Sequence, residues 1–330
     1  MVGVFTLHLA GTYMAHAPAW WFVTSPDGSL VFTVLALVLD TTVMPLLFVL
    51  GGYTAAASLD RHRWRDFARR RLTRVGLPWV LGVVVLAPPT TWLWPYARGV
   101  TVDPLAFLGL FWAGPAFSQS VYWFLGVLLA FNLLTPAFRL LPPASLVPLS
   151  VAGSLALAQH YPLDHWLSGP LTLQPARAAV LAACYAAGVL VHDRGGAPRA
   201  SRVVLATMAL AAQLGHVGAR HLVDHGAPGS TTLLALAFSA AAWTTVALLS
   251  NEAPRWLSSP SPLARAFARH GYGIYLLHPL VLLPLALAAR HLPLPALPRG
   301  LLTGALALAL TWAASALLHH HARPWRAVLG

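Results

Sequence analysis

The chain has 330 residues, of which 58% are hydrophobic and only 9% are charged, and its net charge is +12. A water-soluble domain of this length needs far more charge to cover its surface, so this composition excludes a soluble globular protein. Apolar runs of about 18 or more residues can cross a membrane. Such runs recur from end to end, which also excludes a single span followed by a large soluble domain.

Ten apolar runs separated by breakers predict an all-α integral membrane protein that forms one domain over residues 1–330. We expect about ten transmembrane helices, in chain order at 2–17, 30–56, 76–95, 121–138, 145–159, 176–191, 203–219, 231–250, 271–289 and 300–318. A shorter apolar segment, 104–117, is expected to lie at the membrane interface or to re-enter the membrane. Pro-rich breaks such as Pro142–Pro143 fall between the predicted spans, where a missing N–H does least harm.

The first predicted span begins at Met1 without a basic flank. It contains His8 and several hydroxyl side chains, which is not typical of a cleaved signal peptide. We therefore expect that the N-terminus is truncated and that a few native residues precede Met1.

The connection between the second and third spans is rich in arginine. It carries Arg61, Arg63, Arg65, Arg69, Arg70, Arg71 and Arg74. Loops with such an excess of positive charge stay in the cytoplasm, so 58–75 and both termini are predicted to be cytoplasmic. Among the other arginines, those predicted inside are Arg139, Arg194, Arg199, Arg202, Arg255, Arg265, Arg269, Arg323 and Arg326. Those predicted outside are Arg98, Arg177, Arg220, Arg290 and Arg299.

The arginine loop has more charge than topology alone requires. Arg71 and Arg74 are three residues apart, so on a helix they share a face and suit a phosphate group. Acidic lipid headgroups would satisfy the same patch. Charge alone leaves both alternatives open. The arginines interrupt apolar spans and do not line one polar face, so nucleic acid is not expected as a partner.

Ionisable side chains inside predicted spans mark candidate functional sites because charge is costly there, and we single out His8, Asp40 and His278. His8 can act as a general base or can simply be buried against a carbonyl group. Asp40 either fixes helix packing or orients a histidine. His278 precedes Pro279 and can also serve only to pack and cap the helix break there.

Other chemistry finds little support in the sequence. No Gly-rich phosphate loop precedes a helix, and no residues have convincing metal-ligand spacing, so no metal is expected. The single Cys184 excludes a disulfide framework. Tryptophans in the predicted outer loops can stack on a sugar ring or form the ordinary interfacial belt.

Several motifs together resemble the membrane-bound acyltransferase family 3. HLAGTYMAHAPAWW, at 8–21, is similar to the family's first-span histidine motif, and MPLLFVLGGYTAA, at 44–56, resembles its second span. FARRRLTRVGLPWVLG, at 67–82, looks like its basic loop with an Arg-x-x-Arg pair. VYWFLGVLLAFNLL, at 121–134, and GYGIYLLHPLVLL, at 271–283, are similar to two later helices of the family.

The resemblance implies transfer of an acyl group, commonly acetyl, from cytoplasmic acyl-CoA to a hydroxyl of an extracytoplasmic carbohydrate or lipid-linked acceptor. It implies a multi-pass protein of the bacterial cell membrane, in contact with membrane lipids. The residues assigned to catalysis are His8 and, as a candidate, Asp40; those assigned to the acyl-CoA site are Arg70, Arg71, Arg74, Tyr122, Trp123 and His278.

One feature of the family pattern is missing from this sequence. Many members carry an Arg or Lys eleven residues before the first-span histidine, but counting back from His8 runs past Met1, and counting from His16 reaches Phe5. A transporter or flippase without covalent chemistry is the alternative function. A degenerate family member that acts as a sensor is a third.

Overall fold

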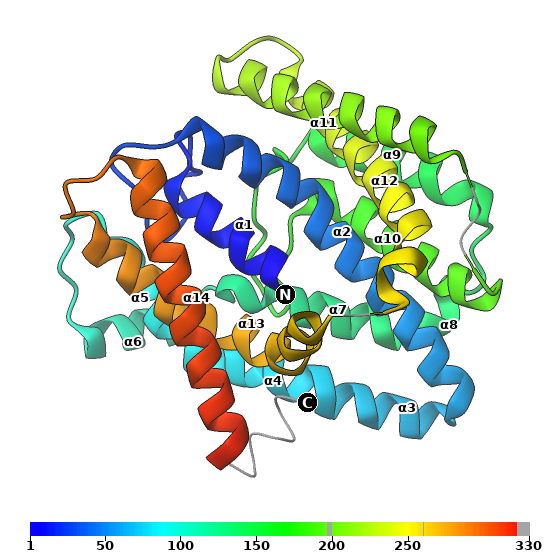
Figure 1. Cartoon of the computed structure of the whole chain (residues 1–330), viewed down its shortest axis with the longest axis horizontal. Coiled ribbons are helices and arrows are strands. Elements are labelled where there is room, and N and C mark those ends of the chain that lie inside the picture. The colour runs from blue at the N-terminus through cyan, green and yellow to red at the C-terminus, as the bar shows by residue number, and fades with distance from the viewer. Residues whose placement is uncertain (197–199, 260, 322–330) are drawn as a thin grey trace.

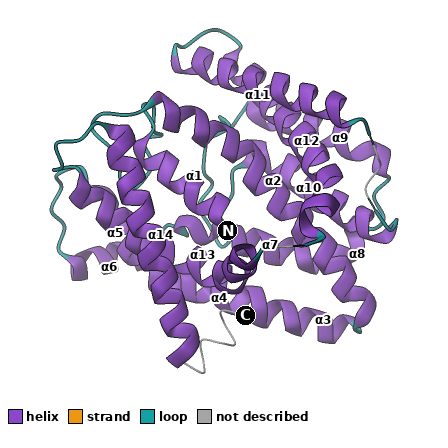
Figure 2. Cartoon of the chain, viewed as in Figure 1, coloured by secondary structure: helices purple, strands orange, loops and turns teal. Residues whose placement is uncertain are grey.

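The computed structural model describes residues 1–196, 200–259 and 261–321. The predicted cytoplasmic arginines Arg199, Arg323 and Arg326 lie outside these residues. Within them the chain is built from helices and loops (Figure 2). Each of the ten predicted apolar segments contains a helix, so the all-α fold class is confirmed.

The helices follow one another along the chain, with short 3₁₀-helical or π-helical pieces labelled η. In order they are α1 (Val2–Tyr13), α2 (Leu30–Arg61), α3 (Trp64–Arg71), η1 (Leu72–Gly76), α4 (Leu77–Leu81), η2 (Gly82–Leu86), α5 (Ala87–Tyr96), α6 (Pro104–Trp112), η3 (Ser120–Tyr122), α7 (Trp123–Leu133), α8 (Thr135–Phe138), η4 (Pro143–Ser145), α9 (Leu146–Ala158), α10 (Pro175–Asp193), α11 (Arg202–Asp224), α12 (Ser230–Leu257), α13 (Pro262–Ala289) and α14 (Ala296–His321).

Seven helices among the described residues are long and apolar enough to cross a membrane. They are Leu30–Arg61, Trp64–Tyr96, Pro175–Asp193, Arg202–Asp224, Ser230–Ala253, Ala264–Ala289 and Ala296–His320. Two further predicted spans form shorter apolar helices, Ser120–Leu133 and Pro143–Ala158. The chain is therefore a multi-pass membrane protein.

The first helix is shorter than the predicted segment 2–17, because it ends at Tyr13. Met14 is extended, and the loop that follows folds back over the helix end. The backbone N–H of Ser25 donates to the Thr12 carbonyl and that of Ser29 donates to the Tyr13 carbonyl. These bonds replace the helical ones that the last turn would otherwise need.

The third span is one long helix, Trp64–Tyr96, that contains two π-helical turns. Pro78 has no N–H to donate to the Arg74 carbonyl, so the regular pattern cannot continue there. The turn widens so that Leu77 donates to Leu72, five residues back. The freed Arg74 carbonyl accepts a hydrogen bond from the Tyr272 hydroxyl at 3.3 Å. Pro78 therefore frees the carbonyl that bonds this helix to Tyr272 of α13.

The connections gather at two ends of the helix bundle. We call the end with the connection from α2 to α3, which carries the arginines at 61–74, the arginine end. The opposite end, with the aromatic-rich segments at 14–29 and 97–119, is called the aromatic end. Figure 1 shows the connections that follow α1, α5 and α13 together on one side, and the turn after α2 on the other.

Helices α2 and α10 pack closely along their length and run parallel to each other. Asp40 meets Arg177 towards the aromatic end, and Asp60 meets His192 at the arginine end. Between them, a Cβ on Gly52 would overlap the Tyr185 carbonyl, and a Cβ on Gly188 would overlap the Val49 carbonyl. Small residues let helix backbones approach closely in membranes, so this reciprocal pair sets the spacing of the two helices.

Candidate active site

Helix α1 carries His8 through the middle of the bundle. It packs against α2, α13 and α14 (Figure 1). Phe5 and Leu9, on the same helix, are buried, whereas His8 is only half-buried. Because α1 ends at Tyr13, five residues after His8, His8 lies inside the bundle and the chain leaves the helix soon after it, towards the aromatic end.

His8 lies directly against His278 of α13. Its Nδ1 is 2.6 Å from the Nε2 of His278, and the two rings are nearly parallel, with centroids 4.9 Å apart. The side chain of His278 is fully buried. These two histidines, 270 residues apart in the chain, therefore form one hydrogen-bonded pair.

Pro279 sets the proton positions of this pair. It has no N–H to donate to the Tyr275 carbonyl four residues back, so that carbonyl is free to accept from another group. The Nδ1 of His278 lies 2.8 Å from it and 3.1 Å from the Ile274 carbonyl. Carbonyl oxygens only accept, so Nδ1 of His278 carries the proton and its Nε2 is the acceptor.

The same logic fixes the tautomer of His8. Because the Nε2 of His278 accepts, the Nδ1 of His8 must donate, which leaves the lone pair of His8 on its Nε2. Among the described residues, no side chain or carbonyl bonds this nitrogen. A neutral histidine with one nitrogen anchored and the other free has the form that a general base requires.

His8 lines a cavity of about 690 Å³, a size typical of sites for small molecules. The walls come from α1, α2 and α10 and from the segments that gather at the aromatic end. Trp21 packs on His8 with ring centroids 5.4 Å apart, and its indole N–H donates to the Thr12 hydroxyl at 3.2 Å. The free nitrogen of His8 is therefore next to a space that can admit a substrate.

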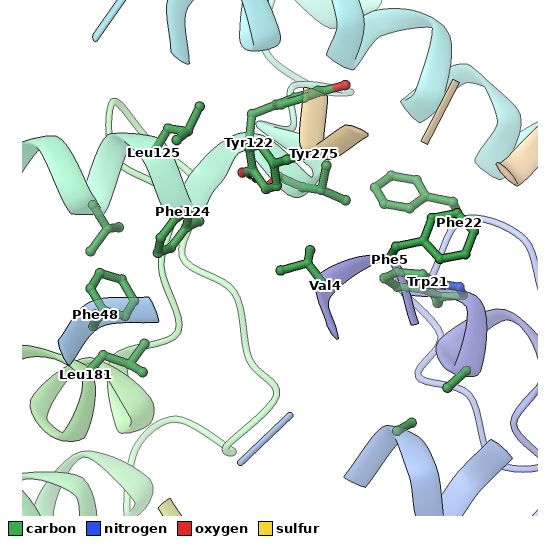
Figure 3. Close-up of a cluster of buried hydrophobic side chains, with 14 of the residues drawn as sticks. Val4, Phe5, Trp21, Phe22, Phe48, Tyr122, Phe124, Leu125, Leu181 and Tyr275 are labelled. Carbon is green, nitrogen blue, oxygen red and sulfur yellow. Dashed lines mark hydrogen bonds between the residues drawn. The ribbon is translucent and has the colours of Figure 1, made fainter. Parts of the chain in front are cut away.

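Two tyrosines hold the helix turn that carries His278. The Tyr122 hydroxyl donates to the Leu276 carbonyl at 2.9 Å, and the Tyr275 hydroxyl donates to the Val121 carbonyl at 2.8 Å. Figure 3 shows Tyr122 beside Tyr275, with Phe5, Trp21 and Phe22 grouped on the side of α1. Tyr122, assigned above to the acyl-CoA site, is fully buried and bonded to α13, whereas Trp123 lines the cavity.

Asp40 also lines the cavity but does not contact His8. It forms an ion pair with Arg177 of α10, whose Nη1 is 2.6 and 2.7 Å from the two carboxylate oxygens. Both side chains are mostly buried. Of the two roles considered for Asp40, the geometry favours helix packing, because His278 is the residue that orients His8.

The arginines assigned to acyl-CoA lie at the arginine end, around the start of the third span. Arg70 and Arg74 are exposed, and Arg71 is half-buried, with Nη2 donating to the Thr54 carbonyl of α2 at 2.7 Å. The Nε of Arg71 is buried without a partner among the described residues. Arg71 is thus anchored to α2, and its two neighbours are open to solvent.

Three other arginines fix the connection that carries Trp20 and Trp21. Arg98 donates to the carbonyls of Ala19 and Trp21, and Arg290 donates to that of Thr24. Arg299 pairs with Asp27. Burial lowers the pKa of Arg290, and burial together with repulsion from Arg290 lowers the pKa of Arg98. These bonds make the wall of the cavity near His8 rigid.

In the described part of the chain, one group of side chains has the composition of a metal site: Asp60, His192 and Asp193. Arg139 already bonds both carboxylates, at 2.7 Å to Asp60 and 3.0 Å to Asp193. A guanidinium in this position neutralises the charge that a cation would need. The group therefore acts as an ion-pair cluster that ties α2 to α10.

Comparison with protein families decides the identity of the chain. Residues 1–317 match the acyltransferase domain of acyltransferase family 3. The chain belongs to acyltransferase family 3. This confirms the resemblance drawn from the motifs, and the protein is accordingly a membrane acyltransferase. No curated protein and no solved structure shows a significant match.

Sequence reasoning missed Tyr275, and for Trp21 it offered sugar stacking or the interfacial belt but not the packing on His8. The signal for Tyr275 was present in the sequence, because Pro279 four residues later necessarily frees its carbonyl. Nothing in the sequence indicated that His278 would meet His8, since that contact depends on how α1 and α13 pack.

Proposed function

We propose that this family 3 acyltransferase transfers an acyl group, commonly acetyl, from acyl-CoA to a hydroxyl of a carbohydrate or lipid-linked acceptor. The observation that carries the proposal is the chain of hydrogen bonds from the Tyr275 carbonyl through His278 to His8, which ends in a free nitrogen beside the cavity. The acceptor hydroxyl would bind in that cavity, next to Nε2 of His8.

In the proposed reaction His8 acts as general base. Its Nε2 takes the proton of the acceptor hydroxyl while the hydroxyl oxygen attacks the thioester carbonyl carbon. The C–S bond then breaks, an ester forms, and the coenzyme A thiolate receives the proton back from His8. His278 stabilises the protonated His8 by accepting from its Nδ1, and base catalysis of this kind contributes roughly 10²–10⁴-fold.

The acyl donor is proposed to bind at the arginine end. Coenzyme A carries a pyrophosphate and a ribose phosphate, and guanidinium groups bind phosphate oxygens through forked, charge-assisted hydrogen bonds. Arg70, Arg71 and Arg74 are placed together there, with two of the three exposed. The acyl-pantetheine arm would then run from this patch towards His8.

The orientation we propose puts the arginine end and both termini in the cytoplasm, with about ten spans in a bacterial cell membrane. Support comes from the five arginines predicted outside. Arg177, Arg220 and Arg299 pair with carboxylates, and Arg98 and Arg290 bond backbone carbonyls. Most of the exposed arginine charge lies at the opposite end, as the positive-inside rule requires.

The test is to incubate membranes that contain the protein with acetyl-CoA labelled in the acetyl group and to follow the label into glycan and lipid fractions. We expect a labelled product whose label is released by mild base, as expected for an ester. Membranes with the empty vector serve as the control. Movement of an unmodified glycan across reconstituted vesicles, with no label transferred, would instead support the transporter alternative.

A further inference from the structure

The cavity has a second polar wall, away from His8, formed by the segment 166–174 between α9 and α10. Leu167 and Leu173 pair through two backbone hydrogen bonds of 3.0 and 3.2 Å. The Gln119 amide donates to the carbonyls of Gly169 and Pro170 at the tip of the turn. This segment is therefore held rigidly although it has no regular secondary structure.

Three polar atoms on this segment are buried without a hydrogen-bond partner among the described residues. They are the indole N–H of Trp166, the hydroxyl of Thr172 and the amide nitrogen of Gln174. Thr172 and Gln174 are each only 6% exposed, and all three residues line the cavity. Buried polar groups nearly always have a partner, so three unpaired ones on one wall indicate a ligand that supplies oxygen acceptors.

The charges beside this wall indicate what kind of ligand fits. Arg177 pairs with Asp40, and Arg220 lies 3.5 Å from Asp164 and 3.0 Å from Asp224. Three carboxylates therefore face two guanidinium groups. Because no positive charge is left over, a phosphate or carboxylate would gain little here, whereas an uncharged hydroxyl-rich group would not be repelled.

Aromatic contacts connect the wall with the catalytic pair. Trp166 packs edge-on against Trp123 and Trp20, with centroids 5.2 and 5.5 Å apart. Trp20 in turn contacts Trp21, which packs on His8. A ligand that reaches both Trp166 and His8 must therefore extend past two indole rings, and the apolar faces of sugars pack well on such surfaces.

We propose that Trp166, Thr172 and Gln174 form a second subsite of the cavity, which binds an uncharged sugar ring of the acceptor other than the ring that is acylated. The proposal rests on the proposed function for the position of the acylated ring. The subsite therefore favours acceptors with at least two sugar rings. It also favours a neutral over an acidic ring at this subsite.

The test measures binding of the purified protein, in detergent and without acyl donor, to an array of neutral and uronic-acid-containing oligosaccharides of one to four rings. We expect neutral members of two or more rings to bind more tightly than single rings or acidic counterparts. Thr172→Val and Gln174→Ala should each weaken the best interaction about threefold to tenfold, the effect of one lost hydrogen bond between neutral groups.

Matched controls are Thr232→Val and Gln159→Ala, which remove the same groups from an exposed contact outside the cavity. The melting temperature is the second readout. Because the hydroxyl of Thr172 and the amide nitrogen of Gln174 have no hydrogen-bond partner in the described part of the chain, Thr172→Val and Gln174→Ala should leave the melting temperature unchanged or raise it. If these residues served only folding, replacing them would lower the melting temperature.

Three results would overturn the subsite: no array member binds, acidic or single-ring members bind as tightly as neutral longer ones, or both wall variants retain full affinity. Acyl transfer is measured separately, with labelled acetyl-CoA. Glycan binding without any transfer would reject the proposed reaction and leave the subsite standing. Transfer without an effect of the wall variants would reject only the subsite.

Discussion

At the residue scale, Pro279 and His278 are neighbours in α13 and act on each other through the backbone. Proline removes one N–H from the helix, which frees the Tyr275 carbonyl, and His278 uses that carbonyl to fix its own tautomer. His8 then receives a defined acceptor for its Nδ1 proton. The position of the base is thus set by a feature of the main chain and not by a carboxylate.

Replacing Pro279 with Ala should restore the N–H that competes with His278 for the Tyr275 carbonyl. We expect kcat for acyl transfer to fall about threefold to tenfold, the effect of weakening one buried hydrogen bond, with KM for acyl-CoA little changed. Steady-state kinetics of the purified variant measure this. Pro284→Ala, in the same helix but five residues further on, is the control and should keep wild-type kcat. An equal loss of kcat in Pro279→Ala and Pro284→Ala would mean that proline affects catalysis through the shape of α13 and not through the Tyr275 carbonyl.

Replacing His278 with Phe keeps a ring of similar size but removes the acceptor for His8. We expect kcat to fall about 10- to 100-fold, because a misplaced base loses much of its effect. His278→Gln, which offers a side-chain oxygen, should recover part of the loss. The exposed His160→Ala is a control for the loss of a histidine elsewhere. Full activity of His278→Phe would show that His8 needs no partner.

At the element scale, the packing of α2 against α10 connects the aromatic end of the bundle with the arginine end. The helices touch through Gly52 and Gly188, and their ends are tied by Asp40–Arg177 and by the ion pairs around Asp60. Since Asp40 and Arg177 both line the cavity, this packing also shapes part of the cavity wall. The spacing of α2 and α10 therefore fixes where the Asp40–Arg177 pair lies in the cavity wall.

A methyl group at Gly52 should force α2 and α10 apart. For Gly52→Ala we expect a loss of stability of about 1–3 kcal/mol, typical of overpacking, seen as a lower melting temperature in detergent. Gly215→Ala is the matched control, because a Cβ there meets no other atom within 4 Å and alanine favours helix. An unchanged melting temperature for Gly52→Ala would show that the close approach is not required.

At the scale of the whole molecule, the five arginines predicted outside differ in their surroundings from the exposed arginines of the connection at 61–74. Those predicted outside are engaged with carboxylates or carbonyls, whereas Arg70 and Arg74 at the arginine end are exposed. The proposed orientation predicts that most unpaired positive charge lies at the arginine end. It also separates the proposed donor site from the cavity that would hold the acceptor.

The orientation can be tested by labelling single cysteines in a Cys184→Ala background, since Cys184 is the only native cysteine and is buried. Ala113→Cys lies in an exposed connection of the aromatic end, and Arg65→Cys lies at the arginine end. An impermeant maleimide should label Ala113→Cys in intact cells and Arg65→Cys only after permeabilisation. The reverse pattern would contradict the proposed orientation.

Much of the fold could be predicted from the sequence, because apolar runs long enough to span a membrane leave helices as the only choice. Helix ends were harder to predict: α1 stops at Tyr13 because residues 25 and 29, far along the chain, satisfy its last carbonyls. His8 and His278 were both singled out, but their contact depends on the packing of α1 with α13. For the wall at 166–174, the sequence offered Trp166 as an outer-loop tryptophan that can stack on a sugar ring, but nothing in it indicated the unpaired Thr172 and Gln174.

The most direct measurement of the central claim is the rate of acyl transfer by the variant His8→Gln, compared with wild type at equal amounts of folded protein. Glutamine can still donate towards His278 but cannot take a proton from the acceptor hydroxyl. We expect kcat to fall by about 10²–10⁴-fold, the usual contribution of a general base, with insertion and acyl-CoA binding retained. Acyl transfer at the wild-type rate by His8→Gln would contradict the account.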